Sequence, residues 1–258
     1  MIFEAEAEKW EIKERLIERS ELFNQLELLE KGDKKMSKKI LLFDCETTGL
    51  DPNRNGLIQL AMIMDIDGKI VDELQVNIRP FNEDMINLVN KTVEFSFQEL
   101  KDNIDTVGIE KLAITEIAVS EIDKFICPQG AIGTINKFLQ KHINKFDKAD
   151  KAYIGGYNLP FDTAFVSEFY EKCGDKYLGS YINWKQIDVR QMLYMLDFEG
   201  KLSLENYKLS TACDHFGIEL EAHNPMSDIK ATRELFYIIK DGNYGKDKGN
   251  ETTSKCKE

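Results

Sequence analysis

The chain has 258 residues, of which 42% are hydrophobic and 31% are charged, and its formal net charge is −12. A chain of this length can bury a sizeable core as one large domain with appendages or as two small domains. The acidic balance argues against a protein that coats nucleic acid through general basicity, but it is compatible with an enzyme that grips one chain end through metal ions.

The sequence has no apolar run approaching the roughly 18 residues of a membrane span, and its N-terminus lacks the pattern of a signal peptide. Its five cysteines are far apart and form no C-x-x-C pair. This spacing argues against a structural zinc site or a disulfide framework. We therefore expect a reduced, cytoplasmic protein that does not enter a membrane.

Residues 1–35 carry a helical pattern of their own. Apolar side chains recur at helical spacing between Trp10 and Leu29 among many charged residues, and Gly32-Asp33 supplies a stop signal. The pattern fits a docking helix, for a polymerase or a second copy of the chain, as well as it fits a solvated helix folded onto its own domain. We predict an amphipathic extension at 1–35, a main domain at 36–240 and a disordered tail at 241–258.

The main domain begins with an apolar run that ends in two acids. The run covers residues 40–43, the acids are Asp44 and Glu46 on either side of Cys45, and a Thr-Thr-Gly turn follows at 47–49. This pattern predicts a buried strand on which the two acids share one face and Cys45 points to the other. Two acids on one face of a core strand are costly without a positive partner, and divalent metal ions are the best candidates.

Further strands and helices are predicted along the chain. Residues 57–64 and 70–78 predict two strands of a meander. Helices are predicted over 83–91, 96–102, 115–126 and 131–146, and a charged, solvated connector over 145–151. We assign no function to the region 82–135.

The C-terminal half alternates short strands with helices. Strands are predicted over 152–157 and 184–189, and helices over 158–173, 190–196, 209–216 and 227–240. Asn158 suits a helix cap and Pro160 a first turn, which places Asp162 near a helix start beside a strand. We interpret Asp188 as the cap of the next helix in preference to a support of the site.

Each acidic motif alone favours a structural interpretation. Asp162, four residues after Asn158, fits a capped helix start, and His223 with Asp228 fits a surface turn followed by a helix-start acid. Their combination with Asp44 and Glu46 is more specific, because four carboxylates then lie at the ends of elements with a histidine nearby.

The order of these motifs resembles that of the DnaQ-like (DEDDh) 3′–5′ exonucleases, which include the proofreading exonuclease of bacterial DNA polymerase III and ribonuclease T. Tyr157 stands where many members have histidine, and Asn-Pro-Met at 224–226 replaces a small, Ala-rich spacer. The resemblance covers residues 36–240 apart from much of 82–135. The matching segments are Phe43-Asp44-Cys45-Glu46-Thr47-Thr48-Gly49-Leu50-Asp51, Gly156-Tyr157-Asn158-Leu159-Pro160-Phe161-Asp162 and His223-Asn224-Pro225-Met226-Ser227-Asp228.

The resemblance implies an α/β, ribonuclease H-like fold, with a mixed five-stranded sheet flanked by helices. It also implies two Mg²⁺ or Mn²⁺ ions and stepwise release of nucleoside 5′-monophosphates from a 3′ end. We expect Asp44 to bridge the ions, with Glu46, Asp162 and Asp228 completing the ligand set. His223 is the expected general base, because an imidazole titrates near working pH.

The turn after the first strand is the expected seat of the terminal nucleotide. Its backbone N–H and hydroxyl groups would face the sugar and phosphate, and Leu50 would lie against the base. Two residues of the second motif would support the geometry of the strand end. The expected substrate contacts are Thr47, Thr48, Gly49, Leu50, Asn158 and Phe161.

We expect DNA, preferentially single-stranded, as the substrate. RNA trimming is the alternative, because it uses the same five chemical positions and no evident feature of the sequence reads a 2′-hydroxyl. A third interpretation is a non-catalytic, polymerase-associated module that docks through residues 1–35. The five intact chemical positions count against this third interpretation.

Overall fold

A mixed five-stranded sheet forms the centre of the computed structural model, which describes residues 37–89, 93–104, 111–113, 115–221 and 224–245. The strand order is β3-β2-β1-β6-β7. β1 pairs antiparallel with β2 and parallel with β6, β2 pairs antiparallel with β3, and β6 pairs parallel with β7. The sheet strands are β1 (Lys39–Thr47), β2 (Leu57–Ile66), β3 (Lys69–Asn77), β6 (Ala152–Gly156) and β7 (Ile182–Asp188).

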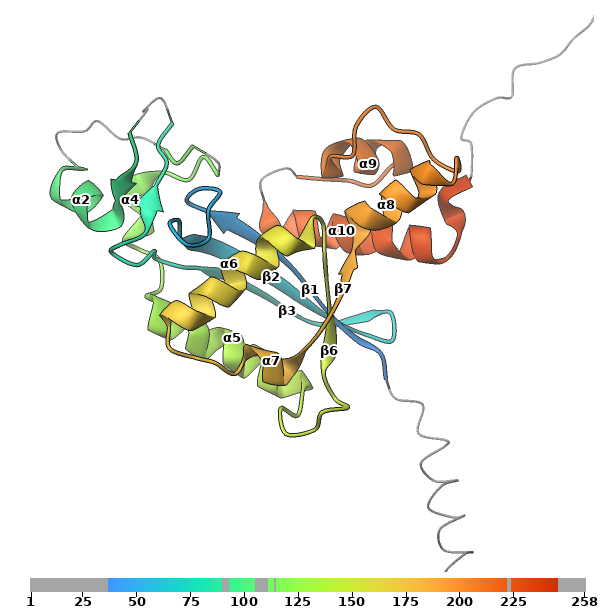
Figure 1. Ribbon diagram of the computed structural model, residues 1–258, viewed down its shortest axis with the longest axis horizontal. Coiled ribbons are helices and arrows are strands. Elements are labelled where there is room, and N and C mark those ends of the chain that lie inside the picture. Colours follow the sequence, from blue (N-terminus) through green and yellow to red (C-terminus); the bar gives the residue numbers. More distant parts are fainter. Residues whose placement is uncertain (1–36, 90–92, 105–110, 114, 222–223, 246–258) are drawn as a thin grey trace, which may run out of the picture. The chain divides into compact units, whose positions relative to one another are not determined.

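The alternation of side chains along β1 divides the core between the two faces of the sheet. Leu41 and Phe43 pack into a cluster with α5 (Pro128–His142), α6 (Leu159–Lys172) and α7 (Leu178–Tyr181). Ile40 and Leu42 pack on the opposite face. The helices of that face are α8 (Val189–Phe198), α9 (Leu209–Phe216) and α10 (Pro225–Lys240). Figure 1 shows these two helical layers on either side of the sheet.

The region 82–135, to which the sequence assigned no function, contains a small lobe. Its apolar cluster includes Ile86 and Phe97 and packs against Ile58 of β2. The predicted helix over 83–91 is wrong, and only four residues of the predicted helix over 115–126 are helical. The elements of the lobe are β4 (Met85–Ile86), β5 (Phe95–Ser96), α2 (Phe97–Asp102) and α4 (Val119–Ile122).

Tertiary hydrogen bonds explain why the stretch after Glu83 is not a helix. The Met85 N–H donates to the Arg54 carbonyl over 2.7 Å, and the Asn87 N–H donates to the Thr48 carbonyl over 3.0 Å. These amides therefore bond to the turn that follows β1, whereas a helix would need them to bond to carbonyls four residues earlier. The helix predicted over 96–102 is confirmed, with Ser96 and Glu99 forming a capping box.

The C-terminal elements follow the sequence prediction closely. Asp188 caps α8 by accepting a hydrogen bond from the Arg190 N–H over 3.0 Å, and Gly217 ends α9 with φ of 70°. The disorder predicted from residue 241 is wrong for the first residues of the tail, because Asn243–Gly245 form a 3₁₀ helix, η1. The extension predicted at 1–35 lies outside the described residues.

A buried ion pair attaches α10 to the β2–β3 turn. Asp65, 1% exposed, accepts from Arg233 Nε over 2.7 Å, from the Tyr237 hydroxyl over 3.0 Å and from the Gly68 N–H over 2.8 Å. Arg233 Nη2 also donates to the Gly68 carbonyl. Because α10 also carries Asp228, this contact fixes the helix relative to the sheet that holds the other acids.

We expect Arg233→Met to lower the free energy of unfolding by about 3 kcal/mol, because it leaves Asp65 charged and buried without its cation. The matched control is Lys230→Met on the same helix, whose partner Glu73 is 36% exposed, with an expected loss below about 1 kcal/mol. Urea denaturation monitored by circular dichroism measures both. Equal losses in the two variants would contradict a structural role for the Asp65 contact.

Candidate active site

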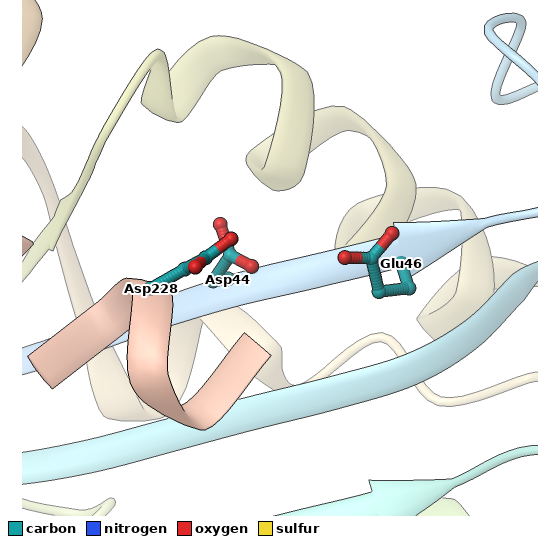
Figure 2. A group of neighbouring side chains, drawn as sticks. All are labelled: Asp44, Glu46 and Asp228. Carbon is teal, nitrogen blue, oxygen red and sulfur yellow. The ribbon is translucent and has the colours of Figure 1, made fainter. Parts of the chain in front are cut away.

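Three carboxylates meet at the end of β1. Asp44 and Glu46 lie on β1 and Asp228 lies in the first turn of α10, and each offers an oxygen within 4.8 Å of the oxygens of the others. Figure 2 shows Asp44 and Asp228 pointing toward one another, with Glu46 farther along the strand. Cys45 belongs to the opposite core cluster, which confirms the predicted alternation of β1. The structure thus brings the acid of α10 to the two acids of β1, and their role as metal ligands stays a prediction.

Burial and repulsion between charges raise the pKa of Asp44 and of Glu46. The pKa of Asp44 is raised well above its usual range, first by burial and then by the charges of Asp162, Asp228 and Glu46. The pKa of Glu46 is raised to about 7 by burial and by the charge of Asp228. Without a cation, the carboxyl groups of Asp44 and Glu46 therefore keep their protons to a higher pH than usual. A divalent cation bound between them would favour the charged carboxylates.

Asp162 approaches β1 from the opposite helical layer. It is 3% exposed, and its Oδ1 accepts a hydrogen bond from the Cys45 N–H over 2.9 Å. The pairing of β1 with β6 ends at Leu42 and Gly155, so the Cys45 amide is available for this side chain. Burial raises the pKa of Asp162 to about 8 against the lowering effect of the hydrogen bonds from Cys45. The three-carboxylate group does not include Asp162, but its charge acts directly on Asp44.

His223 lies outside the described residues, so its predicted role as general base stays a prediction. The residues on its C-terminal side are fixed by hydrogen bonds. The Asn224 side chain caps α10 by accepting from the Met226 and Ser227 N–H groups, and the Ser227 hydroxyl accepts from the Glu221 N–H over 2.9 Å.

The Thr-Thr-Gly turn is fixed by hydrogen bonds to other parts of the chain, which its sequence does not predict. The Thr48 hydroxyl donates to the Met85 carbonyl over 2.7 Å and accepts from the Gly56 N–H over 2.8 Å, while the Thr48 N–H donates to the Gly56 carbonyl. These bonds occupy the groups of Thr48 that were expected to face a nucleotide. The Thr47 hydroxyl donates to the Gly49 carbonyl over 2.6 Å. Leu50 is 73% exposed, and its contact with a base stays a prediction.

Asn55 organises this turn and was missed in the sequence. It is 4% exposed, its Oδ1 accepts from the Asp51 N–H over 3.0 Å, and its Nδ2 donates to the Met85 carbonyl over 2.9 Å. A Cβ at Gly49 would lie 2.3 Å from the Asn55 side chain, so only glycine fits there. The Asn55 contacts are tertiary, and a single Asn in a turn carries no signal for them.

The second motif is joined to the end of β7. Asn158 adopts a left-handed backbone with φ of 60°, and its side chain does not cap α6, contrary to the prediction. Its Oδ1 instead accepts from Arg190 Nη2, and its N–H donates to Asp188 Oδ1 over 3.1 Å. Phe161 is partly buried, with its ring centroid 4.9 Å from that of Phe165. Asn158 therefore joins the start of α6, which carries Asp162, to the end of β7. The supporting role of Phe161 stays a prediction.

The donor set fits a hard divalent cation. Three carboxylates from two elements offer oxygen ligands alone, which suits Mg²⁺ or Mn²⁺ better than a soft metal.

The described part of the chain contains no helix with the length and apolar character of a membrane span.

Comparison with known proteins finds relatives that act on nucleic acids by name. No protein-family model matches the chain. It is 27% identical over 204 residues to the DNA polymerase III PolC-type of Lacticaseibacillus paracasei, which covers 79% of this chain and 11% of that protein. It is 27% identical over 208 residues to ribonuclease T of Wigglesworthia glossinidia brevipalpis, which covers 77% of this chain and 83% of that protein.

The chain is related to the DnaQ-like exonucleases. The resemblance seen in the three motifs is thus confirmed. A crystal structure of E. coli exonuclease I in complex with a dT13 oligonucleotide superposes with a TM-score of 0.57 at 18% identity, over 79% of this chain and 41% of that chain. This likeness confirms the predicted ribonuclease H-like fold. The chain spans only a small part of the polymerase relative and less than half of exonuclease I.

We expect the metal-free protein to lose stability as the pH rises from about 5 to about 8, because the folded acids keep protons that the unfolded chain releases near pH 4. Mg²⁺ or Mn²⁺ should therefore raise the melting temperature more at pH 8 than at pH 6. Thermal unfolding with EDTA and with each metal measures both effects. Glu46→Gln should flatten the pH dependence, and metal-free stability that is constant over this range would contradict the charge repulsion.

Proposed function

We propose that the chain is a metal-dependent 3′–5′ exonuclease that releases nucleoside 5′-monophosphates from single-stranded DNA. The observation that carries this proposal is the cluster of Asp44, Glu46 and Asp228, with Asp162 held beside it by the Cys45 amide. The similarity to ribonuclease T and to a PolC-type polymerase supports the reaction class.

Two Mg²⁺ or Mn²⁺ ions, held by Asp44, Glu46, Asp162 and Asp228, would supply activation of the attacking water and neutralisation of charge on the leaving 3′ oxygen. His223 takes the proton from the attacking water. Leu50 meets the terminal base, and N–H groups of the turn other than that of Thr48 meet the sugar and phosphate without reading sequence. Thr48 and Asn55 act by holding this turn in place.

DNA is the favoured substrate because the superposed exonuclease I binds a dT13 oligonucleotide and the relative from Lacticaseibacillus paracasei is a DNA polymerase. RNA is the second candidate, because ribonuclease T is matched over 83% of its length and the polymerase over only 11%. A non-catalytic module docking through residues 1–35 would not need the four acids to be retained. The cytoplasmic location and the association of residues 1–35 with a polymerase or a second copy stay predictions.

We expect Asp44→Asn to abolish cleavage and to raise the stability of the metal-free protein, because it removes one of the repelling charges. His223→Ala should lower the rate by about 10² to 10⁴-fold. Gel assays of labelled oligonucleotides and thermal unfolding measure the two effects. The matched control is Asp214→Asn, an exposed carboxylate on α9, which should change neither.

A His223→Ala variant that cleaves at the wild-type rate would refute the assignment of the base. Full activity in excess EDTA would remove the metal mechanism, and wild-type protein with no cleavage and no metal-induced rise in melting temperature would favour the non-catalytic module.

The choice of sugar requires a direct comparison of substrates. We expect 5′-labelled single-stranded DNA to be shortened faster than duplex DNA or RNA of the same sequence, with either Mg²⁺ or Mn²⁺ present. Denaturing gels would resolve a ladder of products that shorten from the 3′ end. A ladder on RNA alone would overturn the preference for DNA and leave the exonuclease class intact.

A further inference from the structure

A hollow of about 550 Å³ lies on the flank of the second motif. Its walls come from Pro160 in the first turn of α6, from residues 186–188 at the end of β7 and from one face of α8. The volume falls in the range of about 300–1,000 Å³ that is usual for small-ligand sites. None of its lining residues belongs to the carboxylate cluster.

The hollow is joined to the catalytic edge of the sheet. β1, β6 and β7 are parallel, so their carboxyl ends lie at the same edge. Pro160 precedes Asp162 by two residues on the same helix, and Asp188 Oδ1 accepts from the Asn158 N–H over 3.1 Å. A strand whose 3′ end lies at the carboxylates can therefore reach this hollow with the nucleotides that precede the terminal one.

The lining has the chemistry of a site for a flat, apolar group with polar edges. Met192, Met195 and Ile187 supply apolar contact, and the Met195 side chain is 57% exposed. Gln186 and Gln191 supply amides that both donate and accept hydrogen bonds. The described residues that line the hollow include no lysine or arginine, so it does not suit a phosphate group.

Asp188 adds an unused acceptor to this wall. It is 9% exposed, and its Oδ1 accepts from the N–H groups of Asn158 and Arg190. Its Oδ2 is buried and has no hydrogen-bond partner in the described part of the chain. A buried carboxylate oxygen without a donor is costly, and a ligand N–H group removes this cost when the Asp188 side chain turns this oxygen toward the hollow that it lines.

We propose that this hollow binds a nucleobase of the substrate strand, upstream of the scissile phosphate. The base packs against the methionines of α8 and Pro160, and its N–H groups face Asp188 and the two glutamines. This inference rests on the proposed exonuclease function and adds a second contact that holds the strand while the terminal nucleotide is cleaved. Such a contact tolerates every base, because each has an apolar face and a polar edge.

The experiment compares Met195→Glu with Phe198→Glu, which adds the same charge to α8 at a residue that is 86% exposed and outside the hollow. The substrates are a nitrophenyl ester of a single nucleoside 5′-monophosphate and single-stranded DNA oligonucleotides. The oligonucleotides carry one abasic residue at each position upstream of the terminal nucleotide in turn. Gln191→Ala serves as a second, uncharged variant of the hollow.

We expect Met195→Glu to raise the KM for oligonucleotides by about 5- to 100-fold, the range of one base contact, and to leave ester hydrolysis unchanged. Phe198→Glu should change neither. One abasic position should raise the wild-type KM by a similar factor and have little further effect in Met195→Glu, because both changes remove the same contact. Gln191→Ala should reduce the penalty of the same abasic position.

An abasic penalty of the same size in wild type and Met195→Glu would overturn this inference while leaving the exonuclease function intact. Unchanged cleavage by Met195→Glu together with a changed molar mass in light scattering would assign the hollow to a protein contact and also overturn it. Failure of the wild type to cleave any oligonucleotide or the ester would refute both proposals together.

Discussion

Negative charge gathered on one face of β1 is the constraint on which this structure depends. Asp44 and Glu46 repel each other and Asp228, and burial raises the pKa of both β1 acids. The arrangement persists because apolar side chains on both faces of the same strand are buried, with Leu41 and Leu42 at 1% and 2% exposure. Packing of β1 thus supplies the free energy that offsets the cost of its charged end, and a divalent cation would remove that cost.

The elements around the acids hold them from three directions. The Asp65–Arg233 contact attaches α10 to the sheet, the Cys45 amide bonds Asp162, and Asn158 joins the start of α6 to Asp188 at the end of β7. The lobe that follows β3 is hydrogen-bonded to the turn after β1 through backbone N–H groups in and next to β4. Precise placement of ligands requires such supporting contacts, because a metal site tolerates little displacement of its carboxylates.

Several residues have roles that differ from their local chemistry. Asn158 has the side chain of a helix cap, but its left-handed backbone leaves that side chain to accept from Arg190. Thr48 carries groups suited to a nucleotide, but the chain itself uses them in the turn. In both cases a partner distant in sequence competes for the polar group, and the tertiary bond replaces the local one.

The sequence by itself determined the strand with Asp44 and Glu46, the helix starts that carry Asp162 and Asp228, and the relationship to DnaQ-like exonucleases. These features are local, because alternation, capping and motif spacing act over a few residues. Only the tertiary structure decided that 83–91 is not a helix, that Asn55 holds the turn and that a hollow lies beside α8. Those outcomes depend on hydrogen bonds and packing between segments far apart in the chain, which no local pattern encodes.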